Sequence, residues 1–192
     1  MKKAYQILAL SFAAVVLAAC GSSRGEELSL EDDFQEVDIN GQYKMHVPDY
    51  MEQSYDLNAE ASLQYQNIIK ETYVIIIDED KQEFVDMFQL IGMYDDEMSV
   101  IDNYAHVQTE SLLENVTVEA KTEPKNYKIN GLPAVTTEIE GEASGVIYPI
   151  YYYMTFVEGA ENLYMIMAWT LQDSKDTYSK TFEQMVKSFE EI

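Results

Sequence analysis

The runs Val146–Val157 (VIYPIYYYMTFV) and Leu163–Thr170 (LYMIMAWT) decide the fold. In both runs the two alternating sets of positions are mainly apolar or aromatic, and only the short loop Glu158–Asn162 separates the runs. Successive side chains of a strand point to opposite faces of a sheet, so a strand that is apolar on both sides must be covered on both sides. We therefore predict a central β-hairpin enclosed between two other layers of structure.

Three segments with helical spacing supply candidates for those layers. Asp80 with Glu83, and Ser99 with Asp102, have the spacing of an N-cap residue and its partner three positions on. A third helix is predicted to start at Asp173 or Ser174. The predicted apolar stripes are Phe84, Phe88 and Ile91 in the first helix, Ile101, Tyr104, Ala105 and Leu112 in the second, and Tyr178, Phe182, Met185 and Phe189 in the third.

The remaining extended segments are bounded by turn signals. Val37–Val47 contains Asn40-Gly41, a pair typical of a tight hairpin turn, and Asn130-Gly131 marks another turn. The other predicted strands are Ser62–Ile68, Glu71–Ile77, Val116–Thr122 and Val135–Glu140. The order of strands, two helices, strands and a final helix predicts an α+β fold, with an antiparallel β-sheet flanked by helices on both faces.

The first residues have the pattern of a bacterial lipoprotein signal peptide. Lys2 and Lys3 precede an almost wholly apolar run, and Leu17-Ala18-Ala19 leads directly into Cys20. An apolar run of about 13 residues is too short for a transmembrane helix, which needs roughly 20. An ordinary secretory signal would not require a cysteine immediately after the cleavage site. We therefore expect removal of residues 1–19 and lipidation of Cys20 by acyl chains such as palmitate.

The chain is therefore expected to consist of three parts: a signal peptide (1–19), the lipidated cysteine with a flexible acidic tether (20–33), and one domain (34–192). Two or more acyl chains are needed for stable anchoring, so Cys20 is expected to hold the domain at a membrane surface. The expected location is extracytoplasmic: the outer face of the cell membrane in a Gram-positive bacterium, or the outer membrane in a Gram-negative one.

Charge and cysteine content exclude several classes of function. The chain has 35 acidic and 12 basic residues, giving a net charge of −23, and removal of Lys2 and Lys3 leaves −25. Such a charge repels nucleic acid, so we expect no nucleic-acid partner. Cys20 is the only cysteine, so its lipidation would leave no thiol for disulfides, catalysis or metal binding.

Several segments of the domain resemble the PsbP-like family, which includes DcrB-like bacterial lipoproteins. They are Tyr43–Pro48 (YKMHVP), Asn130–Ala134 (NGLPA), Tyr164–Ala168 (YMIMA) and Phe182–Phe189 (FEQMVKSF). The resemblance covers residues 34–191 and implies an α/β/α sandwich. That family has no shared catalytic residues, so the resemblance implies a module that binds or supports the assembly of another component.

No catalytic or metal-binding pattern stands out. Ser144 lies in a near-match to a serine elbow with one residue too many before the serine. His46 is predicted in a strand beside Pro48 and His106 inside a helix, so we interpret each as a surface or packing residue and not as a catalytic base. Asp78–Asp80 and Asp95–Glu97 could offer oxygen ligands to calcium but lack the EF-hand glycine and glutamate. We therefore predict no catalytic residue, no metal site and no cofactor.

The fifteen tyrosines include the run Tyr151–Tyr153. Tyrosine suits binding surfaces because it combines a large ring with a polar tip, although a buried strand would use it equally well. We take Tyr152 as core and keep Tyr151 and Tyr153 as the candidate binding surface. The sequence thus predicts a non-enzymatic envelope lipoprotein with a protein partner. Its alternatives are a carrier of a small hydrophobic ligand or lipid, and a hydrolase based on paired carboxylates.

Overall fold

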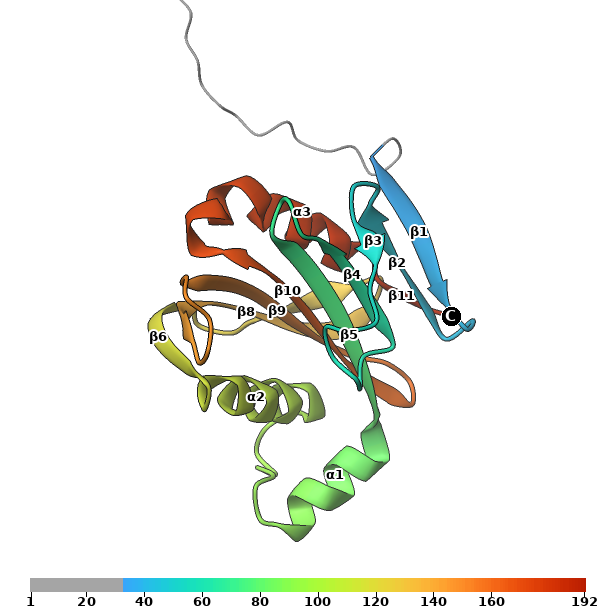
Figure 1. The fold of residues 1–192 in the computed structure, drawn as a ribbon. Coiled ribbons are helices and arrows are strands. Elements are labelled where there is room, and N and C mark those ends of the chain that lie inside the picture. The colour runs from blue at the N-terminus through green and yellow to red at the C-terminus, as the bar shows by residue number, and fades with distance from the viewer. Residues whose placement is uncertain (1–32) are drawn as a thin grey trace, which may run out of the picture.

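The computed structural model describes residues 33–192, and an antiparallel sheet of eight strands runs through its centre (Figure 1). The central pair, β9 and β10, corresponds to the two apolar runs of the sequence. Across the sheet the strands are β3 (Glu52–Gln53), β4 (Leu63–Asn67), β5 (Thr72–Asp80), β10 (Asn162–Leu171), β9 (Ile150–Glu158), β8 (Leu132–Ala143) and β6 (Val116–Lys121), with β7 (Lys125–Ile129) also pairing with β8.

A second, three-stranded sheet is formed by β1 (Phe34–Ile39), β2 (Tyr43–Pro48) and β11 (Glu190–Glu191). Asn40 and Gly41 have positive φ angles of 55° and 69°, as the predicted tight hairpin turn requires. The short strand β11 joins the last residues of the chain to β2. The sequence predicted the hairpin but neither β11 nor this separate sheet.

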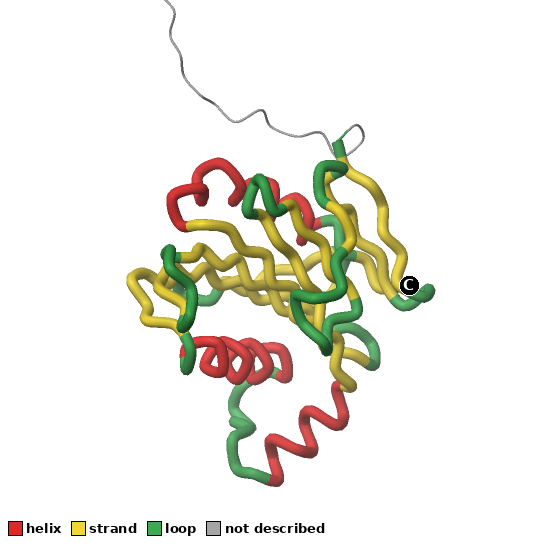
Figure 2. The backbone as a smooth tube through the Cα atoms, in the orientation of Figure 1, coloured by secondary structure: helices red, strands yellow, loops and turns green. Residues whose placement is uncertain are grey.

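Helices lie on both faces of the large sheet, as predicted (Figures 1 and 2). α3 (Lys175–Lys187) follows a short 3₁₀ turn, Gln172–Ser174, and packs over β9 and β10 on one face. α2 (Val100–Leu113) packs over β8, β9 and β10 on the other face. α1 (Lys81–Leu90) extends β5 away from the sheet, and Phe84 is its one buried residue.

The buried strands divide the apolar side chains into two cores. Tyr151 and Val157 of β9 face α3 and belong to a core with Phe182 and Met185. Met154 and Phe156 face α2 and belong to a second core, where Phe156 meets the ring of Tyr104 edge-on at 5.7 Å. The first eight residues of β9 are buried, which confirms the prediction of cover on both faces.

Two of the three predicted helix starts are confirmed in atomic detail. The Asp80 carboxylate accepts a hydrogen bond from the Glu83 backbone N–H at 2.8 Å, and the Ser99 hydroxyl accepts one from the Asp102 N–H at 3.2 Å. α3 begins after Ser174, but no side chain caps it, because the preceding 3₁₀ turn already leads the backbone into the helix.

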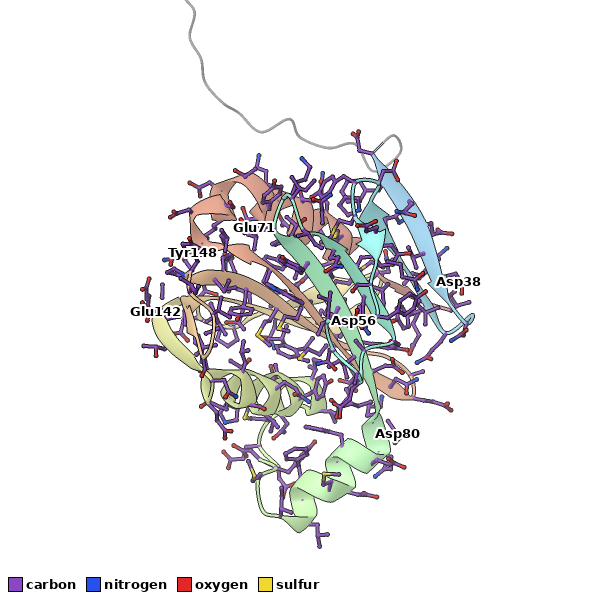
Figure 3. The ribbon with its side chains drawn as sticks, in the orientation of Figure 1. Asp38, Asp56, Glu71, Asp80, Glu142 and Tyr148 are labelled. Atoms are coloured by element: carbon purple, nitrogen blue, oxygen red, sulfur yellow. The ribbon has the colours of Figure 1, made fainter. Side chains whose placement is uncertain are left out.

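The predicted strand Val146–Val157 starts four residues too early. β9 begins only at Ile150, and Val146, Ile147 and Tyr148 lie on an exposed connection after Gly145, whose φ is 82°. Figure 3 shows Tyr148 at the outer edge of the molecule. Gly145 turns the chain, and Pro149 has no N–H to donate to a ladder, so pairing starts after it. The sequence also missed β7, which is mainly polar and exposed.

The predicted signal peptide (1–19), Cys20 and the predicted tether up to residue 32 lie outside the described residues, so they stay predictions. Within residues 33–192, no helix is both long enough and apolar enough to cross a membrane.

Candidate binding cleft

The two tyrosines predicted as a binding surface lie at the bottom of an open cleft of about 690 Å³. Tyr151 is fully buried and Tyr153 is 9% exposed, so both are part of the core as well as of the cleft floor. The cleft lies between α3 and strands β7, β8 and β9. Its lining residues are Lys125, Asn126, Tyr127, Thr136, Glu138, Tyr151, Tyr153, Lys175, Ser179, Lys180, Glu183 and Lys187.

The cleft lies beside α3, which packs over β9 and β10, and it extends over the neighbouring strands β7 and β8. Residues at alternate positions of β9 face α3, which places Tyr151 and Tyr153 on the floor and Tyr152 in the opposite core. The tight turn at Asn130 and Gly131, with φ angles of 47° and 93°, folds β7 back beside β8 and makes it the outer wall.

Tyr151 is held by charged groups at the floor of the cleft. Its hydroxyl donates a hydrogen bond to Glu138 Oε2 at 3.0 Å, and Lys175 Nζ lies 5.0 Å from the centre of its ring. Burial first, and the nearby Glu138 carboxylate second, raise the pKa of Tyr151 above its ordinary value. The phenol therefore keeps its proton at physiological pH and acts as a donor.

A chain of hydrogen-bonded hydroxyl groups runs from the cleft lining into the buried sheet. The hydroxyls of Tyr127 and Thr136 are hydrogen bonded at 2.7 Å, and those of Thr136 and Thr155 at 2.6 Å. Burial raises the pKa of Tyr153, whose hydroxyl also interacts with Thr136. These residues come from three neighbouring strands, so the floor is polar although it lies on a buried sheet.

Four lysines line the cleft, and only two of them form ion pairs with carboxylates in the described residues. Lys175 Nζ donates to Glu140 Oε1 at 2.6 Å and lies 3.6 Å from Glu138, while Lys187 pairs with Glu183 at 2.6 Å. Lys125 and Lys180 are exposed and form no ion pair with any residue in 33–192. Two ammonium groups at the cleft therefore have no ion-pair partner among the residues that the structure describes.

The fold is similar to that of a solved protein structure. The solution structure of cyanobacterial PsbP (CyanoP) from Synechocystis sp. PCC 6803 is similar with a TM-score of 0.55 and 12% identity, over 92% of this chain and 99% of that one. The chain has a PsbP-like fold. The α/β/α sandwich implied by the sequence resemblance is thus confirmed.

Two further solved structures are similar with lower TM-scores. A Pseudomonas aeruginosa protein of unknown function, PA94, gives a TM-score of 0.45 at 13% identity, over 81% of this chain and 95% of that one. LpqN, involved in cell envelope biogenesis of Mycobacterium tuberculosis, gives 0.47 at 11% identity, over 83% and 91%. No family model and no curated protein matches the sequence.

The carboxylates of this PsbP-like domain's cleft are poorly placed for hydrolysis. Glu138 and Glu183 both line the cleft, and each forms an ion pair with a lysine. The neighbouring Glu140 has its pKa lowered by the hydrogen bond from Lys175. A glycosidase pair needs one carboxyl group held protonated as the general acid. These groups therefore fit ion pairing better than acid catalysis.

The other residues tested in the sequence lie away from this cleft. His46 is in β2, His106 in α2, and Ser144 in an exposed turn after β8. Within residues 33–192 no group of three or more histidine, cysteine, aspartate or glutamate side chains is arranged to hold a metal ion. Of the two acidic clusters considered for calcium, one supplies the Asp80 cap of α1 and the other a turn in which Asp95 accepts from the Glu97 N–H.

A smaller pocket of about 310 Å³ lies on the opposite face, between α2 and the sheet. Val135 and Phe156 contribute its apolar part, and Glu97, Asp102 and Glu110 contribute carboxylates. It is the described feature closest to the sheet-and-helix cavity that a carrier of a hydrophobic ligand would need. Its volume is at the lower end for a ligand pocket.

Sequence reasoning found the tyrosines of the PsbP-like domain's cleft but missed its lysines and Glu138. Lys180 and Lys187 are seven positions apart and therefore share one side of α3. That spacing was available in the sequence. Lys125 could not be assigned, because the strand that carries it was not recognised.

Proposed function

We propose that this protein is a lipid-anchored, extracytoplasmic binding module that performs no catalysis and binds another envelope component through the cleft beside α3. The observation that carries the proposal is the cleft itself. Tyr151 and Tyr153, the two residues singled out from the sequence, line its floor together with hydroxyl donors and lysines. This combination of a concave shape and convergent polar groups is typical of binding sites.

Two further observations support the non-catalytic, anchored role. The carboxylates at the cleft are engaged by lysines, so the arrangement holds charges in fixed positions without setting apart an acid and a base. The Leu17–Cys20 sequence has the pattern of a lipoprotein processing site.

A photo-crosslinking experiment tests the cleft. The full chain carrying p-benzoylphenylalanine in place of Ser179, which lines the cleft, is expressed and irradiated in intact cells. The matched control carries the same group in place of Thr177, an exposed residue of α3 outside the cleft. We expect a discrete product, identified by mass spectrometry as an envelope component, from position 179 alone. Identical products from both positions, or none from position 179, would contradict the proposal.

The anchor is tested separately with Cys20→Ala. Lipidation requires the cysteine sulfur, so we expect the substituted chain to lose incorporation of labelled palmitate and to accumulate as an uncleaved precursor. The control is Ser22→Ala, which removes a hydroxyl next to the site and keeps the thiol. Equal labelling of the Cys20→Ala chain and the parent would show that the anchor is assigned wrongly.

The pocket between α2 and the sheet favours a second candidate, a carrier of a small hydrophobic ligand or lipid. Val135 and Phe156 supply the apolar surface that such a ligand would contact. Native mass spectrometry of the full chain, gently released from membranes, is expected to show an additional bound mass in this case. A mass equal to that of the lipidated chain alone would rule the carrier role out.

A further inference from the structure

We propose that the cleft binds a ligand bearing phosphate or carboxylate groups, held between Lys125 on β7 and Lys180 on α3. This inference rests on the proposed function, because it names the chemistry of the ligand that the same cleft would take. It goes beyond that function by assigning the recognition to two particular side chains.

The distribution of charge over the molecule singles the cleft out. Residues 33–192 contain nine lysines, no arginine and thirty-one acidic residues, and the acidic side chains labelled in Figure 3, from Asp38 to Glu142, lie on widely separated parts of the surface. The cleft lining contains four of those nine lysines but only two of the acidic residues. Cations are therefore concentrated at one place on a strongly anionic protein.

Only part of this positive charge is available to a ligand. Lys175 lies between the carboxylates of Glu138 and Glu140, and its Nζ also lies over the Tyr151 ring, so it stabilises the floor. Lys187 is paired with Glu183. Lys125 and Lys180 remain, exposed and without an ion-pair partner in the described part of the chain.

These two lysines come from opposite walls of the cleft. Lys125 starts the β7 strand of the outer wall, while Lys180 projects from α3, and Ser179 adds a hydroxyl donor next to Lys180. The Tyr151 hydroxyl below them already donates to Glu138 Oε2, so the donors offered to a ligand here come from the two lysines and Ser179. All of these groups donate hydrogen bonds, which suits a ligand rich in acceptor oxygens.

The size of the cleft sets a lower limit on the ligand. A volume of about 690 Å³ is far more than a single phosphate ion fills and falls in the range of pockets for small organic molecules. The ligand is therefore expected to carry more than one oxyanion group, or one such group on a larger body, so that both lysines are engaged.

Isothermal titration of the full chain in a neutral detergent tests this inference. The probes are inorganic pyrophosphate, citrate and glycerol 3-phosphate, with choline as the cationic control. We expect saturable binding of at least one of the three anions and none of choline. Preference for glycerol 3-phosphate would indicate a lipid headgroup as the source of the phosphate, and preference for pyrophosphate or citrate a soluble anion.

Variants assign the binding to the two lysines. Each of Lys125→Gln and Lys180→Gln is expected to weaken binding about two- to fivefold, and the double variant about tenfold or more, because partly exposed charge pairs contribute up to about 1 kcal/mol each. Lys128→Gln is the matched control, since Lys128 is an exposed lysine on the same strand but outside the cleft. It should bind within about twofold of the parent.

Loss of folding is separated from loss of charge by the variant Lys125→Arg/Lys180→Arg, which should keep binding. The inference is overturned if no anion binds saturably, or if Lys128→Gln weakens binding as much as the double glutamine variant. Crosslinking from position 179 without any anion binding would leave the proposed function standing and remove this inference alone.

Discussion

The two faces of strand β9 use the same kind of sequence for different purposes. Towards α2 the strand presents hydrocarbon and rings, including Met154 and Phe156, which pack against the helix. Towards α3 it presents Tyr151, Tyr153 and Thr155; the Tyr151 hydroxyl donates to Glu138, and the hydroxyls of Thr155 and Thr136 are hydrogen bonded to each other. A strand that is apolar by composition can therefore bury both faces while only one of them carries polar chemistry.

The largest expected effect is on the α2 face. Phe156→Ala should lower the free energy of unfolding by about 3–5 kcal/mol, because it removes a fully buried ring that packs edge-on against Tyr104. Chemical denaturation measures this loss. Phe156→Leu, which keeps most of the volume, should lose clearly less. A loss below about 1 kcal/mol for Phe156→Ala would mean that the Phe156 ring is not tightly packed on the α2 face.

A smaller effect is expected on the α3 face. Tyr151→Phe keeps the ring in place and removes only the hydrogen bond to Glu138, so the free energy of unfolding should fall by about 1–2 kcal/mol. Glu138 remains near Lys175, which limits the loss. Tyr152→Phe, on the opposite face of the same strand, should change stability less, because the Tyr152 hydroxyl forms no hydrogen bond with any residue in 33–192. An equal loss for both variants would remove the distinction between the faces.

The N-cap residues of α1 and α2, the two helices that follow β5, allow a comparison of how far each helix contributes to global stability. Ser99→Ala should lower the global free energy of unfolding by about 1 kcal/mol, because α2 packs on the sheet. Asp80→Ala removes a similar cap from α1, which has one buried residue and stands away from the sheet. Its effect should appear mainly as faster amide hydrogen exchange within α1, with little change in global stability. A global loss equal to that of Ser99→Ala would show that α1 unfolds together with the sheet.

The sequence specified most of the fold because its signals were local. The alternation of the strands, the Asn-Gly turns and the Asp80 and Ser99 caps depend on neighbours within a few residues, and the structure confirms them. β7 was missed because its residues are polar and pair only through the hairpin with β8. β11 was missed because two glutamates gain strand structure only by meeting β2.

The candidate site was less accessible to sequence reasoning for the same physical reason. Tyr151 and Tyr153 were visible because a tyrosine run stands out, and the alternation of a strand places both on one face. Their partners Glu138, Lys175 and Lys180 lie on another strand and on a helix, so only the tertiary fold brings them together. Which tyrosines face a cleft depends on where α3 packs on the sheet, and no local pattern encodes that position.

The smallest expected effect distinguishes the two faces by the sign of their pH dependence. On the α3 face, the hydrogen bond from Lys175 lowers the pKa of Glu140 from its ordinary value of 4.5. Between the lowered pKa and pH 4.5, the unfolded chain binds more protons at Glu140 than the folded chain does. Glu140 therefore adds stability above pH 4.5, and this contribution is lost as the pH falls through the lowered pKa. On the α2 face, burial raises the pKa of Glu79, which accepts hydrogen bonds from Tyr104 and Gln108.

The folded chain therefore holds the Glu79 proton more tightly than the unfolded chain, and stability falls as the pH rises through this raised pKa. Relative to the parent, Glu140→Gln should be less stable at neutral pH, with a difference that shrinks below pH 4.5. The stability of Glu79→Gln relative to the parent should instead improve from acidic to neutral pH. Denaturant unfolding between pH 3 and pH 7 measures both differences. If the stability difference from the parent changed with pH in the same direction for both variants, the two carboxylates would not lie in the opposite electrostatic surroundings that distinguish the faces of the sheet.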